Sequence, residues 1–155
     1  MKKSVLMVCL GNICRSPLAE GILKNKVDTS NVFVDSAGTA GYHIGNAPDP
    51  RSIAVAKKYD IDISQQRCRK FTPSDFDSFD MIYAMDESNY KNIVRLATTA
   101  DDISKVKLLL EESDNAETEV PDPYYGEHDG FEMVYHLIDS ACAKIAAKLE
   151  TNYGR

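Results

Sequence analysis

The chain has 155 residues, 43% of them hydrophobic and 27% charged, which predicts a single domain over residues 1–155 with a core of its own. Its formal net charge of −6 at pH 7 argues against a nucleic-acid partner. It contains no apolar stretch long enough to cross a membrane, so no membrane association is expected.

The first predicted element is a short buried strand at Val5–Val8, and the loop after it carries reactive side chains. This loop opens on Cys9 and closes on Arg15. Pro17 suits the first position of a helix, for which Ser16 is a candidate N-cap. A strand end, a tight loop and a helix start direct backbone N–H groups at one point, so the sequence predicts an anion-binding site here.

Cys9 and Arg15 give this loop its predicted chemistry. A positive local field favours the thiolate of Cys9, which is the nucleophilic form. Arg15 can place a planar fork of donors on two oxygens of a tetrahedral oxyanion, whereas a nucleotide-binding P-loop would carry Lys-Ser or Lys-Thr. The pattern therefore predicts phosphoryl transfer to sulfur. On spacing alone, the alternative is that Cys9 is a small apolar core residue at a strand end.

Helices and strands alternate along the rest of the chain. Helical spacing follows the loop as far as Val27, and Val32–Val34 is a second short strand that ends at Asp35-Ser36. Two further strands are predicted at Met81–Met85 and Val106–Leu110, and further helices at Asp49-Pro50, near Thr72-Pro73, after Asp86 and across Phe131–Leu149. Residues 37–49 and 111–119 are expected to be loops. This alternation predicts an α/β fold with a parallel sheet covered on both faces.

Several candidate functional residues follow strand ends, and ligands of parallel α/β sheets bind beyond the carboxyl ends of the strands. The residues in such positions are Cys9, Ser36, Asp86 and Asp122. Asp122 lies between Pro121 and Pro123, which restrict its backbone. A carboxylic acid held over an anion site can protonate a leaving oxygen and later deprotonate water. On spacing alone, a simple Asp-Pro turn is the alternative for Asp122.

The stretch Cys9–Pro17, followed by Ala19-Glu20, resembles the signature loop of the low-molecular-weight protein tyrosine phosphatases. The resemblance covers essentially the whole chain, through Asp35–Thr39, Gly45–Asp49, Met85–Asn89 and Asp122–Tyr125. It implies a three-layer, doubly wound fold around a central four-stranded parallel sheet. It also implies a protein-tyrosine phosphatase that hydrolyses phosphotyrosine and aryl phosphate monoesters through a phosphocysteine on Cys9.

The resemblance assigns roles to individual side chains. Arg15 would bind the phosphoryl oxygens, Asp122 would act as general acid and base, and Ser16 would stabilise the thiolate. The implied substrate-binding residues are Leu10, Gly11, Asn12, Ile13, Cys14, Tyr42, Tyr124 and Tyr125, and the implied loop-bracing residues are Asn12, Ser36 and Asp86. For Tyr42 an ordinary exposed loop position is an equal alternative, and for Asp86 a bare helix cap. Gln66 stands where several relatives add a histidine to the bracing network.

The implied partners are phosphotyrosine-containing proteins and inorganic phosphate, and no metal or other cofactor is expected. Scattered histidines and cysteines without zinc-ligand spacing agree with this. Ile13 stands where phosphoarginine-specific members tend to carry threonine, which favours an aryl ester. Cys14 would form a reversible disulfide with the nucleophile. The apolar run at the N-terminus is too short for a signal-peptide core, so a cytoplasmic protein is expected.

Two other functions are compatible with parts of this pattern. A thiol-coupled arsenate reductase uses a similar loop but relays a disulfide through further cysteines. Here Cys68 stands alone and Cys142 falls within a helical pattern, which disfavours that reaction. A non-catalytic phosphate-binding module would be plausible if Cys9, Arg15 or Asp122 were replaced, and all three are present.

Overall fold

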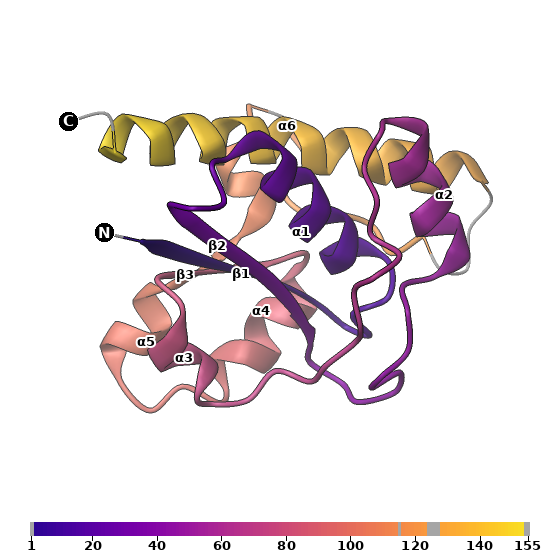
Figure 1. The fold of residues 1–155 in the computed structure, drawn as a ribbon. Helices are drawn as coiled ribbons and strands as arrows, with labels where there is room; N and C mark the ends of the chain where they lie inside the picture. The colour runs from indigo at the N-terminus through magenta and orange to yellow at the C-terminus, as the bar shows by residue number, and fades with distance from the viewer. Residues whose placement is uncertain (1, 115, 124–127, 154–155) are drawn as a thin grey trace.

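The computed structural model describes residues 2–114, 116–123 and 128–153 (Figure 1). The strands in this part of the chain are β1 (Lys3–Cys9), β2 (Val32–Gly38), β3 (Met81–Ala84) and β4 (Val106–Leu108). They form a four-stranded sheet in the order β2-β1-β3-β4, and each neighbouring pair is parallel. The predicted four-stranded parallel sheet is confirmed.

Helices cover both faces of this sheet. They are α1 (Arg15–Lys26), α2 (Pro50–Lys58), α3 (Asp75–Ser78), α4 (Glu87–Val94), α5 (Ala100–Ser104), the 3-10 helix η1 (Leu109–Glu112) and α6 (His128–Tyr153). One apolar cluster packs α1, α2 and α6 against one face, and a second cluster packs α3 and α4 against the other. Figure 1 shows α1 and α6 on one side of the strands and α3, α4 and α5 on the opposite side. The fold is therefore the three-layer, doubly wound arrangement that the sequence predicts.

The central strand β1 shows why the sheet needs cover on both sides. Val5 and Met7 belong to the α1–α6 cluster, whereas Leu6 and Val8 belong to the α3–α4 cluster, and all four side chains are fully buried. Successive side chains of a strand point to opposite faces, so an unbroken apolar run buries both. Each buried aliphatic side chain of this size contributes about 1.5–3 kcal/mol to stability.

Some element boundaries differ from the sequence-based expectation, and not every helix was predicted. β2 continues beyond Ser36 as far as Gly38, because its register with β1 runs to the pair Cys9–Gly38. β4 ends at Leu108, and the next residues form η1 instead of continuing the strand. The helix α5 was not predicted; it is one short turn, capped by the Thr99 hydroxyl, which accepts a hydrogen bond from the Asp102 amide.

The long final helix and the second helix follow their predicted signals. α2 begins at Pro50, and the Asp49 carboxylate caps it by accepting from the Arg51 amide. α6 covers the predicted stretch Phe131–Leu149 and extends beyond it at both ends. In the described residues no helix has the length and apolar character needed to span a membrane.

Candidate active site

The loop between β1 and α1 forms the floor of a cavity of about 270 Å³ at the carboxyl edge of the sheet. The cavity is lined by Cys9, Leu10, Gly11, Ile13, Cys14, Arg15, Tyr42, His43 and Asp122. Residues far apart in the sequence therefore meet at one point, as the strand-end argument predicts. Tyr124 and Tyr125, the two implied aromatic wall residues, lie outside the described residues.

The Cys9 sulfur sits among hydrogen-bond donors at the base of this cavity. The Asn12 backbone N–H donates to it over 3.3 Å, and the Ser16 hydroxyl oxygen lies 3.1 Å away. Asn12 adopts a left-handed backbone conformation, with φ of 58°, which asparagine tolerates better than most residues. Donors arranged around a sulfur favour its negatively charged form.

The start of α1 corrects one sequence-based expectation. The helix begins at Arg15, its N-cap is Cys14, and no side chain caps it, so the prediction of Ser16 as the cap was wrong. Pro17 lies in the first turn, where a missing N–H breaks no helical hydrogen bond. The Ser16 hydroxyl is therefore available to the Cys9 sulfur instead of to the helix end.

Arg15 is held from behind by two acceptors. Its side chain is only 3% exposed, and its Nη1 donates to the Asp86 carboxylate over 2.7 Å and to the Val120 carbonyl over 3.0 Å. Burial alone would lower the pKa of Arg15, but the facing Cys9 and the Asp86 carboxylate outweigh it and raise that pKa. The guanidinium is thus a fixed cation in the cavity wall.

Asp86 makes the contacts expected of each of the two roles considered for it. One carboxylate oxygen pairs with Arg15, and the other accepts from the Asn89 amide over 2.8 Å, which caps α4. Asp86 can therefore cap α4 and hold Arg15 at the same time, because each contact uses a different carboxylate oxygen.

Asp122 faces Arg15 from the opposite rim. Its carboxylate lies 3.6 Å from Arg15 Nη2, and its side chain is 38% exposed. Val120, two residues before Asp122, anchors this loop by two backbone hydrogen bonds. Its amide donates to the Met85 carbonyl, and its carbonyl accepts from Arg15. A carboxylate at this position can reach both the cavity and solvent.

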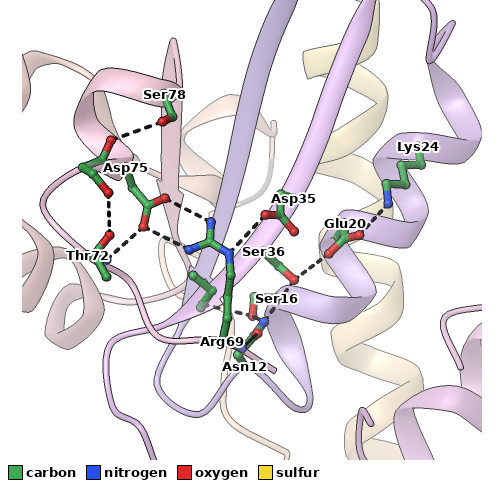
Figure 2. Close-up of polar contacts among 12 residues, drawn as sticks. Asn12, Ser16, Glu20, Lys24, Asp35, Ser36, Arg69, Thr72, Asp75 and Ser78 are labelled. Carbon is green, nitrogen blue, oxygen red and sulfur yellow. Dashed lines mark hydrogen bonds and ion pairs between the residues drawn. The ribbon is translucent and has the colours of Figure 1, made fainter. Parts of the chain in front are cut away.

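The Asn12 side chain ties the loop to its surroundings (Figure 2). Its Nδ2 donates to the Ser16 hydroxyl over 2.8 Å and to the Ser36 hydroxyl over 3.0 Å, while its Oδ1 accepts from the Arg69 amide over 3.0 Å. The Asn12 carbonyl also accepts from the Cys68 thiol at 2.8 Å. These contacts are of the kind expected of loop-bracing residues.

Arg69 and Cys68 also contact the loop, and the sequence did not predict this for either residue. Arg69 pairs with Asp35 of β2 and, through both terminal nitrogens, with Asp75 of α3, as Figure 2 shows. Its backbone is thereby fixed beside Asn12. No motif marks either residue in the sequence, since a single arginine or cysteine in a basic segment gives no spacing signal.

Gln66, which stands where several relatives have a histidine, makes its side-chain hydrogen bond to α1. Its Nε2 donates to the Pro17 carbonyl over 3.1 Å, and its Oε1 is buried without a hydrogen-bond partner among the described residues. The side chain therefore contacts the back of α1. The Arg69 amide donates to the Asn12 side chain, and the Ser36 hydroxyl donates to the Glu20 carboxylate.

The two thiols near Cys9, those of Cys14 and Cys68, are protonated at neutral pH. Burial, then the nearby charges of Asp49 and Cys9, raises the pKa of Cys14 to about 12. Burial, then Cys9, raises the pKa of Cys68 to about 11. All four cysteines lie within the described residues and are unbridged. Neither of these two thiols is a good nucleophile near pH 7, because the thiolate is the reactive form.

Gly38 controls how closely β2 approaches the loop, and replacing it should disturb the site. A methyl group there would lie 2.9 Å from the Leu10 carbonyl oxygen and 3.1 Å from the Asn12 nitrogen, both backbone atoms. We expect Gly38→Ala to lower kcat/KM by about ten- to a hundredfold, because small displacements of reacting groups are costly.

Gly41→Ala is the matched control, since its new methyl group would meet only flexible side chains, the end of Ile44 at 3.1 Å and Lys70 at 3.6 Å. Kinetics on an aryl phosphate with both variants check this. Equal activity of Gly38→Ala and the wild-type protein would show that the close approach is not needed.

An α/β sheet with a cysteine and an arginine in one loop at its carboxyl edge is the arrangement of a cysteine-dependent phosphatase. The family model described as low molecular weight phosphotyrosine protein phosphatase matches residues 4–154. The chain belongs to this family and is a low molecular weight protein-tyrosine phosphatase, which confirms the class predicted from the sequence.

Individual relatives agree with the family match. The chain is 45% identical over 144 residues to the low molecular weight phosphotyrosine protein phosphatase of Schizosaccharomyces pombe, covering 87% of this chain and 90% of that one. It is 40% identical over 151 residues to the corresponding Homo sapiens protein, covering 94% and 95%.

Solved structures show the same fold. A protein tyrosine phosphatase from Entamoeba histolytica superposes with a TM-score of 0.92 at 36% identity, covering 98% of this chain and 99% of that one. Vibrio vulnificus Wzb, solved in complex with benzylphosphonate, superposes with a TM-score of 0.85 at 29% identity, covering 96% and 99%.

Proposed function

We propose that this protein hydrolyses phosphotyrosine and related aryl phosphates through a phosphocysteine intermediate on Cys9. The observation that carries the proposal is that the Cys9 sulfur, the Arg15 guanidinium and the Asp122 carboxylate line one cavity, with Asp122 3.6 Å from Arg15. A nucleophile, an anion clamp and an acid thus surround a space large enough for a phosphoryl group.

In the first step the Cys9 sulfur attacks phosphorus. The S–P bond forms, the bond from phosphorus to the phenolic oxygen breaks, and Asp122 transfers its proton to that oxygen. Arg15 donates to two of the phosphoryl oxygens, which carry charge spread over a plane in the transition state. The Asp86 carboxylate and the Val120 carbonyl hold the guanidinium in place, so little reorganisation is needed.

In the second step water attacks the phosphocysteine. Asp122, now a carboxylate, accepts a proton from that water, the S–P bond breaks, and inorganic phosphate leaves. The sulfur departs as a thiolate, and the Asn12 amide and the Ser16 hydroxyl are placed to stabilise it.

The cavity walls favour an aryl ester. Ile13 and Leu10 line it, and neither side chain has a donor or acceptor for a guanidinium substrate. Tyr42 also lines it but is 73% exposed, so its ring can stack on a substrate only at the mouth. The benzylphosphonate bound by Vibrio vulnificus Wzb, an aromatic phosphonate, supports this substrate class.

Removing the acid tests the mechanism through the leaving group. We expect Asp122→Ala to lower kcat/KM for phenyl phosphate by about 10²–10⁴-fold, the usual contribution of general acid catalysis. The loss for 4-nitrophenyl phosphate should be much smaller, since that oxygen leaves without full protonation. kcat/KM is the quantity to measure because it reports the step in which the leaving group departs.

Asp101→Ala, which removes an exposed carboxylate of α5, is the control and should match the wild-type protein. Equal losses for the two substrates would remove Asp122 from the acid role. Activity that collapses in a metal chelator would contradict the whole scheme.

A further inference from the structure

Behind the catalytic loop, a chain of hydrogen bonds leads from the Cys9 sulfur to a buried carboxylate on α1. Figure 2 shows the part of this chain from Ser16 to the carboxylate. The carboxylate belongs to Glu20, whose side chain is 5% exposed. Its Oε1 accepts from the Ser36 hydroxyl over 2.6 Å, and its Oε2 accepts from the Lys24 ammonium over 2.6 Å. No role in the reaction scheme above uses Glu20.

The orientation of the Asn12 amide gives this chain a direction. A backbone N–H can only donate, so the Arg69 amide fixes the Asn12 oxygen on its own side. The Asn12 nitrogen must then face the two serines, and it donates one hydrogen to Ser36 and the other to Ser16. Both serine oxygens are therefore acceptors toward Asn12.

Each serine has one hydroxyl hydrogen left to place. A carboxylate only accepts, so the Ser36 hydrogen points at Glu20. The Ser16 hydrogen has two acceptors in reach, the Cys9 sulfur at 3.1 Å and the Ala37 carbonyl at 3.5 Å. The nearer acceptor is the sulfur, and an ionised sulfur attracts the hydrogen more strongly than a carbonyl does.

We propose that Glu20 is a positioning residue of this phosphatase: by accepting the Ser36 hydrogen, it keeps the Ser36 oxygen turned toward the Asn12 amide and so helps the Arg69 amide to hold the Asn12 side chain, which donates to Ser16 and leaves the Ser16 hydrogen for the Cys9 thiolate. Glu20 touches neither substrate nor sulfur and acts through three intervening side chains. The inference rests on the proposed role of Cys9 as nucleophile and adds a remote carboxylate to that site.

Lys24 makes the direction of the chain testable. In Glu20→Gln, the ammonium of Lys24 can only donate, so it holds the new amide oxygen on its own side. The new amide nitrogen then faces Ser36 as a donor, and the Ser36 hydrogen loses its acceptor. Without Lys24, the same amide can turn its oxygen to Ser36 and restore the original direction.

The experiment is a double-variant cycle with Glu20→Gln, Lys24→Met and the combination. The readouts are the rate of iodoacetamide alkylation of Cys9 at about pH 5.5 and about pH 9, and kcat/KM on an aryl phosphate. The same variants carrying Cys9→Ser give the background from the other thiols.

We expect Glu20→Gln to slow alkylation about three- to tenfold at the lower pH, the effect of weakening one hydrogen bond of ordinary strength, and less than twofold at the higher pH. In a protein that already carries Lys24→Met, Glu20→Gln should slow alkylation by less than twofold at either pH. In the Lys26→Met background, which alters another lysine of α1, the full loss should persist.

Three results would overturn the proposal: an unchanged rate in Glu20→Gln, a loss equal at both pH values, or a loss that Lys24→Met does not relieve. If Glu20→Gln does not fold, Ser36→Ala breaks the same chain while leaving the Glu20–Lys24 pair intact, and a wild-type rate at the lower pH would overturn it equally. Failure of the proposed function would appear separately, as turnover that survives Cys9→Ser.

Discussion

Replacing Cys9 with serine is expected to abolish phosphatase turnover, with a loss of at least about 10⁴-fold in kcat, as is usual when a catalytic nucleophile is removed. The hydroxyl keeps the size of the side chain and its two contacts, the Asn12 amide and the Ser16 hydroxyl. It does not ionise near neutral pH, so the surrounding donors have no anion to stabilise. Steady-state hydrolysis of 4-nitrophenyl phosphate measures the loss.

Cys142→Ala provides the matched control for thiol removal. Cys142 is fully buried in α6, and burial raises the pKa of its thiol well above the ordinary range. Its loss should leave kcat within about twofold, because it lies on no step of the reaction. Turnover in Cys9→Ser within tenfold of the wild-type protein would show that the nucleophile is another group.

Replacing Arg15 with lysine should cost about 10²–10³-fold in kcat/KM, the range seen when a preorganised donor to a developing charge is removed. Lysine keeps the positive charge but cannot make two parallel hydrogen bonds to a phosphoryl group. It also cannot satisfy the Asp86 carboxylate and the Val120 carbonyl while facing the cavity, as the guanidinium does.

Arg95→Lys is the control for replacing an arginine with lysine, since Arg95 is exposed and its guanidinium donates to the nearby Asn92 side chain of α4. Its kinetics should be those of the wild-type protein. Melting temperatures of both variants separate lost activity from lost stability. A kcat/KM for Arg15→Lys within fivefold of the wild-type value would mean that the charge alone suffices.

Much of the fold and of the cavity could be predicted because the signals are local. The unbroken apolar run of β1 predicts a strand buried on both faces, and the cap-plus-proline pair Asp49-Pro50 predicts the start of α2. Cys9, Arg15 and Asp122 were predicted to meet because parallel strands deliver their carboxyl ends to one edge, and they do line one cavity.

The remaining features depend on contacts between distant segments. Arg69 reaches the Asn12 side chain across 57 residues, and only the packing of β2 and α3 brings it there. The start of α1 was misplaced because serine before proline is a common cap, while here the loop uses the Ser16 hydroxyl on sulfur. A local rule therefore failed at the site where the chemistry is concentrated.

The two oxygens of Asp86 have a consequence for how this protein can change. One oxygen holds the arginine of the cavity and the other secures the first turn of α4. A substitution of Asp86 that changes how Arg15 is held therefore also removes the cap of α4, which packs on the other face of the sheet from α1. We expect substitutions that change activity without loss of stability to occur at Tyr42 and His43, which line the cavity. We do not expect them at Asp86, behind the Arg15 guanidinium.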